Sequence, residues 1–428
     1  MATNTWAALA NSTWNVNGNW SLGHVPLAAE DIVFDVTSVK NCTVDVSPSV
    51  TSLTISVAYT GVWDMTGQTM TIAGNMSDHG ITGAHTYGNG FVFNGASAAV
   101  EFHPGNTAGA VCTNAILTFN GTTAPTLALN TQLSVKPFKQ LILAASVPLT
   151  VSGLYALYIT GPCPVISTGA GSSLASSALL ELTGTAAGNI WNIAGTFSGT
   201  GIVSVYMGAS SIIINIPAVT HTGTGGLNLN GGVMAWTNST FLVTGNLSFA
   251  GSLVCSGAGA GTLLDFNGYN AAFTSNITLY GSNNTMTIRL RSGTFTCTAL
   301  SLPAYANYTL YFDDAIINMA GNLLCSAAAT VYANNAVITM GLPTTTHNIT
   351  TNTKVLPTLR LNSPGKILTL VDNVTCTNFI VLNGTVLYGA FTITTAVKNP
   401  VFSANVPLSP MTLSTCINML PASIVSMR

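Results

Sequence analysis

The segment Gln68-Thr-Met-Thr-Ile-Ala-Gly-Asn-Met-Ser77 recurs twice in this chain with little change. The other copies are Ser239-Thr-Phe-Leu-Val-Thr-Gly-Asn-Leu-Ser248 and Ala315-Ile-Ile-Asn-Met-Ala-Gly-Asn-Leu-Leu324. In each copy, apolar and polar residues alternate, which predicts a short strand. The Gly-Asn pair predicts a corner from which the next strand starts. A corner that is followed by a return to the same sequence motif is typical of a coiled stack of strands.

The spacing of the three copies predicts the length of one coil. Their glycines stand at positions 74, 245 and 321, so the gaps are 171 and 76 residues, nine and four times 19. Solenoid repeats begin at about 20 residues. We therefore predict an all-β fold, a predominantly parallel β-solenoid (β-helix) with coils of 19–20 residues. We expect a cap at both ends, because an open end exposes core and unpaired strand edges.

The composition limits the function classes. The chain of 428 residues is 48% hydrophobic but only 5% charged, and its formal net charge is −2. This balance offers no basic surface for nucleic acid. Its apolar runs are all shorter than the roughly 18 residues that a membrane-spanning helix needs, so we expect no membrane span. The apolar residues are instead distributed along the whole chain in short runs, as expected for many short strands that each bury one face.

The distribution of charged residues and of turn-forming residues suggests three regions. Residues 1–101 hold seven of the twelve acids and are predicted to form an acidic capping or attachment region with the first coils. Residues 102–397 are the predicted solenoid, and residues 398–428 form a predicted C-terminal cap or tail. The start, Met1-Ala-Thr-Asn-Thr-Trp6, lacks the basic and apolar runs of an export signal, which favours folding in a cytoplasm.

Turns are marked by Asn-Gly pairs, which tolerate positive φ. Examples are Asn94-Gly95, Asn120-Gly121 and Asn267-Gly268. We expect the aromatic residues near the N-terminus to fill the open first coil, with a nearby aspartate, Asp31, capping a turn. These aromatic residues are Trp6, Trp14, Trp20 and Phe34.

The N-terminal segment resembles a group of bacteriophage structural proteins. The matching phrases are Trp14-Asn-Val-Asn-Gly-Asn-Trp-Ser21, then Val25-Pro26, then Asp31-Ile-Val-Phe-Asp35. Proteins of this group open with such a Trp-rich phrase and continue as β-solenoid coils. The resemblance covers about 25 residues at the opening, and similar coil phrases are spread over most of the chain. The resemblance implies a virion protein that contacts other capsid or tail proteins and forms homo-oligomers, and trimers are the oligomer that it implies.

We therefore expect a non-enzymatic virion structural protein, a capsid decoration or head fibre. The alternatives are a phage tail-fibre or receptor-binding protein, with a host-surface glycan as a partner, and a bacterial cell-surface adhesin. A polysaccharide-cleaving β-helix enzyme is a further alternative. Its acids would have to be clustered, yet the adjacent pairs Glu30-Asp31 and Asp313-Asp314 point to opposite faces of a strand. Two arginines that share a face, Arg289 and Arg291, have no acid nearby in sequence, although stacking could bring one from another coil.

No residue is predicted to be catalytic, to bind a cofactor or to bind a metal. Three histidines with two acids nearby could hold a divalent metal if the fold gathers them, but we interpret them as polar loop residues. These are His79, His85, His103, Asp78 and Glu101. The eight scattered cysteines are interpreted as free, buried small hydrophobes. Ice binding would need regular threonine columns, for which Thr294-Phe-Thr-Cys-Thr298 and Thr69-Met-Thr71 are compatible fragments.

Overall fold

The computed structural model describes most of the chain, and the statements below concern the described residues. Strand accounts for about 55% of the chain and helix for about 1%. The ranges outside the description are 81–84, 97, 103–113, 122–123, 130–137, 154–155, 162–164, 190, 194, 208–210, 217, 231–237, 258–260, 282–285, 303–307, 327–328, 342–345, 397–400 and 403–428.

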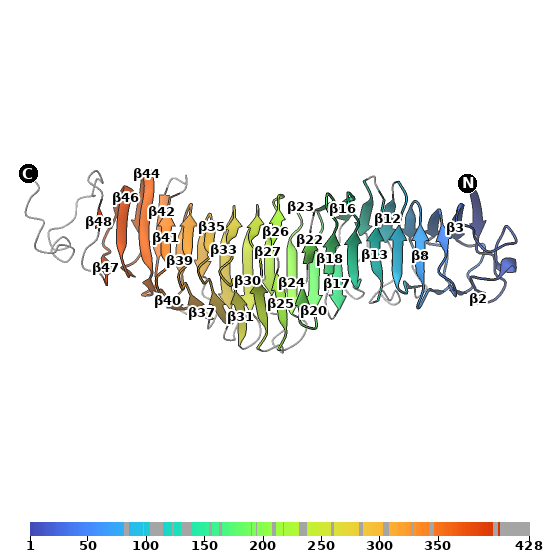
Figure 1. Cartoon of the computed structure of the whole chain (residues 1–428), viewed down its shortest axis with the longest axis horizontal. Helices are drawn as coiled ribbons and strands as arrows, with labels where there is room; N and C mark the ends of the chain where they lie inside the picture. Colours follow the sequence, from blue (N-terminus) through green and yellow to red (C-terminus); the bar gives the residue numbers. More distant parts are fainter. Residues whose placement is uncertain are drawn as a thin grey trace, which may run out of the picture. The chain divides into compact units, whose positions relative to one another are not determined.

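The chain divides into two compact units, and parallel β-solenoid coils build both (Figure 1). Unit 1 comprises Met1–Val205 and His221–Gly225, and unit 2 comprises Tyr206–Thr220 and Gly226–Arg428. Besides the strands given in the next two paragraphs, the described elements are the 3-10 helix η1 (Asn17–Asn19) and the strands β21 (Gly188–Asn189), β24 (Val203–Met207) and β26 (Val219–His221).

In unit 1 the strands of each ladder pair in parallel with strands of neighbouring coils. The first ladder contains β1 (Ala2–Thr5), β3 (Glu30–Phe34), β6 (Ser52–Ile55), β9 (Met76–Asp78), β12 (Ala99–Phe102), β14 (Thr126–Leu129), β16 (Pro148–Gly153), β19 (Ser173–Ser176) and β23 (Thr196–Gly199). The second contains β5 (Ser49–Val50), β8 (Thr69–Ile72), β11 (Gly90–Phe93), β13 (Ile116–Phe119), β15 (Gln140–Leu143), β18 (Val165–Thr168) and β22 (Trp191–Ile193). Shorter ladders contain β2 (Ser12–Thr13), β4 (Cys42–Thr43), β7 (Trp63–Asp64) and β10 (His85–Thr86), and β17 (Leu157–Gly161) with β20 (Leu180–Gly184).

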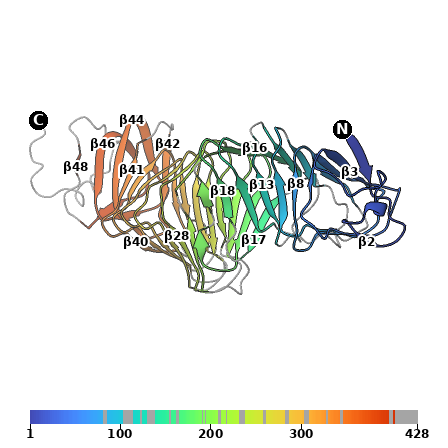
Figure 2. The same ribbon diagram turned by 45° about the vertical axis from the view of Figure 1, so that its right-hand side comes forward.

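Unit 2 has the same parallel construction, and Figure 2 shows its strands β41, β44 and β46 side by side. One ladder contains β25 (Ile213–Ile216), β28 (Thr240–Val243), β31 (Thr262–Asp265), β34 (Met286–Arg289), β37 (Tyr308–Tyr311) and β40 (Thr330–Tyr332). A second contains β29 (Leu247–Phe249), β32 (Ala271–Phe273), β35 (Thr294–Cys297), β38 (Ile316–Met319), β41 (Val337–Met340), β44 (Thr358–Leu370), β46 (Phe379–Leu387) and β48 (Val401–Phe402). A third contains β27 (Leu227–Asn230), β30 (Leu253–Gly257), β33 (Ile277–Gly281), β36 (Leu300–Leu302), β39 (Leu323–Cys325) and β42 (Thr346–Thr350), and it also joins β44. The last contains β43 (Val355–Leu356), β45 (Val374–Cys376) and β47 (Ile393–Thr395).

The predicted parallel β-solenoid is confirmed, but the predicted coil length is wrong for most of the chain. Phe91 pairs with Leu117, 26 positions later, and only near the C-terminal end does the offset fall to 19, between Val374 and Ile393. The three Gly-Asn phrases also do not mark the same corner. The second leads into the β29 ladder, whereas the third leaves that ladder, from β38 to β39. The divisibility by 19 was therefore a coincidence.

The Gly-Asn corners themselves are confirmed, and each asparagine makes the same contact. Asn75, Asn246 and Asn322 accept through Oδ1 the backbone N–H of a residue one coil later, at 2.9, 3.0 and 2.9 Å. The glycine beside each asparagine approaches the preceding coil. At Gly74 an added Cβ would lie 3.0 Å from a backbone oxygen. The asparagine thus satisfies an N–H at a corner where the strand ladder is interrupted.

The Asn-Gly pairs are used in two different ways. At Asn267-Gly268 both residues have positive φ (51° and 82°), as predicted. At Gly95 and Gly121, however, φ is not positive, so the predicted reason is wrong there. A Cβ on Gly95 would lie 1.3 Å from Ala73 O, and one on Gly121 would lie 2.1 Å from Gly95 O. Glycine is needed at these two positions because successive coils come too close for a side chain.

The N-terminal cap contains the four predicted aromatic residues. Trp6, Trp14, Trp20 and Phe34 form an aromatic cluster of edge-to-face and tilted ring pairs, with ring centroids 4.7–6.2 Å apart. All four are buried. An antiparallel bridge between Trp6 and Trp20 covers the edge of the first strand, β1. The predicted closure of the N-terminal end is therefore confirmed.

The turn before β3 is capped by Glu30, not by Asp31 as expected. Glu30 accepts the Leu27 N–H and the Asn4 side-chain amide at 3.0 and 3.1 Å. Strand alternation buries Glu30 and turns Asp31 away, where Asp31 accepts the Ser52 hydroxyl at 2.7 Å. The division into residues 1–101, 102–397 and 398–428 stays a prediction, and most of the last segment lies outside the described residues.

Candidate functional site

Four successive coils of unit 2 end one strand in the same left-handed turn. Asn267, Arg291, Asp313 and Asn334 follow β31, β34, β37 and β40 by two positions, with φ of 51°, 62°, 48° and 45°. Positive φ is uncommon outside glycine, and asparagine and aspartate tolerate it best. An arginine held in this conformation indicates that its side chain is fixed by other contacts.

These turns carry an ion-pair network that links coils. Arg291 binds Asp265 of the preceding coil with two nitrogens, Nε at 3.0 Å from Oδ1 and Nη2 at 2.6 Å from Oδ2. Arg289 donates to Asp313 of the following coil at 3.2 Å, and Asn334 donates to the same oxygen at 3.1 Å. Stacking thus supplies the acids that the sequence lacks near the two arginines.

An aromatic ladder continues the same column of side chains. The strand register places Arg289, Tyr311 and Tyr332 directly opposite one another in three coils. The Arg289 guanidinium carbon lies 4.9 Å from the centre of the Tyr311 ring, within cation–π range. The Tyr311 and Tyr332 rings stack with centroids 4.6 Å apart and planes 7° from parallel, and Tyr332 is 45% exposed. We call these side chains the Tyr–Arg patch: Asp265, Arg289, Arg291, Tyr311, Asp313 and Tyr332.

The electrostatics of the patch are balanced. Burial acts to raise the pKa of Asp265, but hydrogen bonds from the Arg291 side chain and the Asn267 N–H outweigh it and lower that pKa. The Asp265 carboxylate is therefore ionised at neutral pH. Two arginines and two aspartates give the patch a formal net charge of zero, with each guanidinium held in a fixed orientation.

A threonine column runs beside the patch. Thr287, Thr309 and Thr330 lie opposite one another on the three strands that carry the arginine and the tyrosines. The fragments expected for ice binding form no such column. Thr296 lies between Ala272 and Asn318, and Thr71 lies opposite Val92. The strand register therefore argues against an ice-binding face at those fragments.

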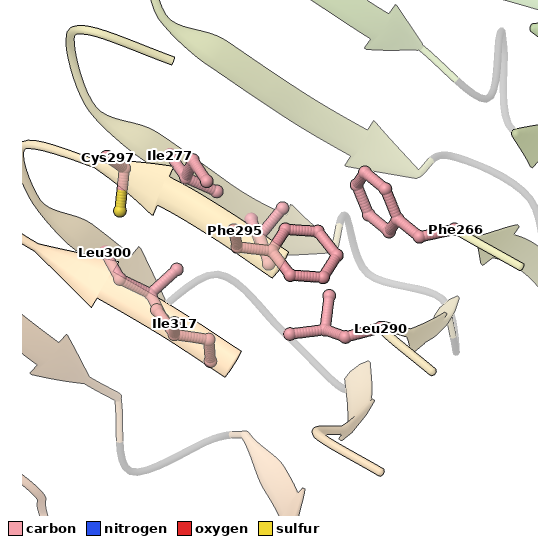
Figure 3. A pocket seen from close by; sticks show the side chains of 8 residues that line it. Phe266, Ile277, Leu290, Phe295, Cys297, Leu300 and Ile317 are labelled. Carbon is pink, nitrogen blue, oxygen red and sulfur yellow. The ribbon is translucent and has the colours of Figure 1, made fainter. Parts of the chain in front are cut away.

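Beneath the patch, the interior of unit 2 contains a small pocket (Figure 3). Phe266 and Leu290, which follow Asp265 and Arg289, turn inward there, and Phe266 contacts Phe295 edge to face at 4.8 Å. The pocket has a free volume of about 10 Å³, room for about one water, and its lining is wholly apolar. Such a space has no group that could bind or transform a ligand. The lining residues are Phe266, Ile277, Leu279, Leu290, Phe295, Cys297, Leu300 and Ile317.

The five residues considered as a metal site are split between two environments. Asp78 and His85 are buried, and Asp78 Oδ2 lies 2.8 Å from His85 Nδ1 and accepts the Tyr87 hydroxyl at 2.6 Å. His79 and Glu101 lie near the surface, 3.4 Å apart. His103 lies outside the described residues. Strand alternation separates the neighbours Asp78 and His79, and the described part of the chain contains no group of three or more ligands that could hold a metal.

The buried pair also corrects the expectation of polar loop residues, because Asp78 and His85 belong to the core. The cysteine interpretation is confirmed for the five described residues that are free and buried. Burial raises the pKa of each of these thiols, which disfavours the reactive thiolate. They are Cys42, Cys255, Cys297, Cys325 and Cys376.

A serine–histidine contact lies in the interior of unit 2. His347 Nδ1 is 3.1 Å from Gly321 O, and His347 Nε2 is 2.9 Å from Ser363 Oγ. Because a carbonyl oxygen only accepts, Nδ1 carries the proton and Nε2 accepts from the serine hydroxyl. His347 and Ser363 are 0% and 1% exposed, and a backbone carbonyl stands where a hydrolase triad has a carboxylate. The contact therefore stabilises the coil.

His347 predicts a dependence of stability on pH. Burial lowers its pKa below the ordinary value, as it does for His221. The unfolded chain then takes up a proton near pH ~6.5 while the folded chain does not, so the free energy of unfolding falls as the pH drops below about 6.5. Urea unfolding at neutral and mildly acidic pH measures this loss. We expect His347→Gln to reduce it, and an unchanged pH dependence in the variant would contradict the assignment.

Comparisons with known proteins give no match to a family model, a curated protein or a solved structure. Among the described residues, no helix is long and apolar enough to span a membrane.

Proposed function

We propose that this protein is a non-enzymatic virion structural protein, exposed on a phage particle as a capsid decoration or head fibre. The observation that carries the proposal is the N-terminal cap, which closes the first coil with tryptophans and exposes apolar side chains around it. Leu9 is 95% exposed, Val36 74% and Leu27 59%. Contiguous exposed apolar patches mark interaction surfaces, and we propose that these three side chains belong to one.

The remainder of the chain supports a mechanical role. Parallel ladders join each coil to the next in both units, and the few charges leave little repulsion between copies. We therefore propose homo-oligomers, in which the N-terminal cap binds other virion proteins and the coils project. Native mass spectrometry of the purified protein measures the oligomeric state, and a monomer at all concentrations would contradict this part.

Density-gradient fractionation of the native source tests the virion role. We expect the protein, followed by mass spectrometry, to band with DNA-filled particles at a fixed copy ratio. A ratio close to the number of capsid subunits would identify a decoration, and a few copies per particle would identify a tail component. Recovery in the cell envelope or the medium would overturn the virion role and favour an adhesin.

The attachment surface has its own test. We expect Leu9→Ser with Val36→Ser to leave the fold intact, because both side chains point to solvent, and to abolish binding to particles that lack the protein. Ile316→Ser, which is 46% exposed on β38 of unit 2, is the matched control and should bind normally.

The Tyr–Arg patch favours a second candidate, a receptor-binding tail fibre or a cell-surface adhesin. Exposed aromatic rings and fixed polar groups are suited to recognition, and decoration alone would not require them.

A further inference from the structure

We propose that the Tyr–Arg patch binds a neutral saccharide chain. This inference goes beyond the structural role above and does not depend on it, because it rests only on the side chains of unit 2.

Charged side chains, which are rare in this chain, are concentrated in the Tyr–Arg patch. The patch contains four of the 22 charged residues of the chain, placed on three successive coils. Arg291 and Asp313 lie in left-handed turns, a backbone conformation that is unfavourable for residues other than glycine. Figure 1 shows the strands concerned, β31, β37 and β40, along one edge of unit 2.

The patch offers aromatic and hydroxyl contacts. Tyr332, which is 45% exposed, presents an aromatic surface for the C–H face of a sugar ring, since aromatic side chains combine an apolar body with a polar tip. Tyr311 is stacked between Arg289 and Tyr332, so its ring faces are covered and it fixes the orientation of the Tyr332 ring. The column of Thr287, Thr309 and Thr330 and the side-chain amide of Asn334 supply hydroxyl and amide partners. Successive coils repeat these groups about every 4.8 Å along the column, so an extended chain of similar units can meet equivalent contacts.

The charges of the patch favour a neutral ligand. Each guanidinium of the patch is engaged by a carboxylate at 2.6–3.2 Å, and the patch is formally neutral. A nucleic acid or an acidic polysaccharide would therefore find no unpaired cation and would lie against the carboxylates of Asp265 and Asp313. A neutral, hydroxyl-rich ligand meets no such repulsion.

The test is a microarray of neutral and acidic oligosaccharides, followed by calorimetry with the best ligand. We expect binding to neutral glycans that changes little between about 0.05 M and about 0.5 M salt, because little net charge is involved. Tyr332→Ala should weaken binding about tenfold, and Tyr332→Phe, which keeps the ring, only about threefold or less. Ile316→Ala, equally exposed on a strand of another ladder, is the matched control and should bind like the native protein.

Three outcomes would overturn the inference. The first is that the protein binds none of the neutral glycans on the array. The second is that it prefers acidic glycans and that this binding weakens strongly with salt. The third is that binding survives both Tyr311→Ala and Tyr332→Ala. Circular dichroism of each variant verifies that the coils are intact. The gradient experiment is independent, so failure of the virion role leaves the saccharide site standing.

Discussion

Trp6→Ala is expected to destabilise the N-terminal coils of unit 1 by about 3–5 kcal/mol, the usual cost of removing a buried tryptophan. Trp6 is fully buried, its ring contacts Trp20 and Phe34, and its Nε1 donates to Lys40 O at 3.0 Å. The variant loses the aromatic cluster and leaves the carbonyl of Lys40 without this donor. Because β1 pairs only with β3 among the described strands, loss of the cap exposes the edge of β3.

Hydrogen exchange with mass spectrometry measures this effect locally. We expect faster exchange in β1 and β3 of Trp6→Ala, with exchange in unit 2 unchanged, because each coil is stabilised mainly by its neighbours. Leu9→Ala is the control in the same segment, since Leu9 is 95% exposed and its truncation should change stability by less than about 0.5 kcal/mol. Equal exchange in Trp6→Ala and the native protein would show that the cluster does not hold the cap.

Gly95→Ala is expected to cost at least about 3 kcal/mol, because the added methyl group has no room. Its Cβ would lie 1.3 Å from Ala73 O of the preceding coil. The backbone there must move, and the move also displaces Gly121, which approaches Gly95 O from the other side. Urea unfolding of the variant should show a lower midpoint for unit 1.

Gly18→Ala separates crowding from the general effect of replacing a glycine. Nothing lies within 4 Å of a Cβ on Gly18, and its φ is not positive, so we expect a change within about 0.5 kcal/mol. If Gly95→Ala and Gly18→Ala had the same stability, the close approach of the coils at Gly95 would be refuted.

Much of the patch could have been found in the sequence by aligning four segments. Four segments share one pattern, a polar or aromatic residue, then an apolar residue, then a residue with positive φ: Asp265-Phe-Asn267, Arg289-Leu-Arg291, Tyr311-Phe-Asp313 and Tyr332-Ala-Asn334. Their spacings are 24, 22 and 21 residues. A fixed period does not align these segments, because coils of unequal length have no common period.

The amino-acid sequence by itself determined the class of the fold. Period-two alternation and Gly-Asn corners specify short strands and sharp turns, and both depend only on neighbouring residues. The Trp-rich start likewise predicted a cap, because so many large apolar rings need a core.

Only the tertiary structure decided which residues meet. It placed Arg291 on Asp265, 26 residues away, and separated the adjacent residues Asp78 and His79 into core and surface. It also showed that position 95 requires glycine because a neighbouring coil lies too close for a side chain, and not because of a positive φ. The physical reason is that contacts between coils depend on the length of every intervening loop. Those lengths set the strand register, and the register decides which side chains lie opposite one another.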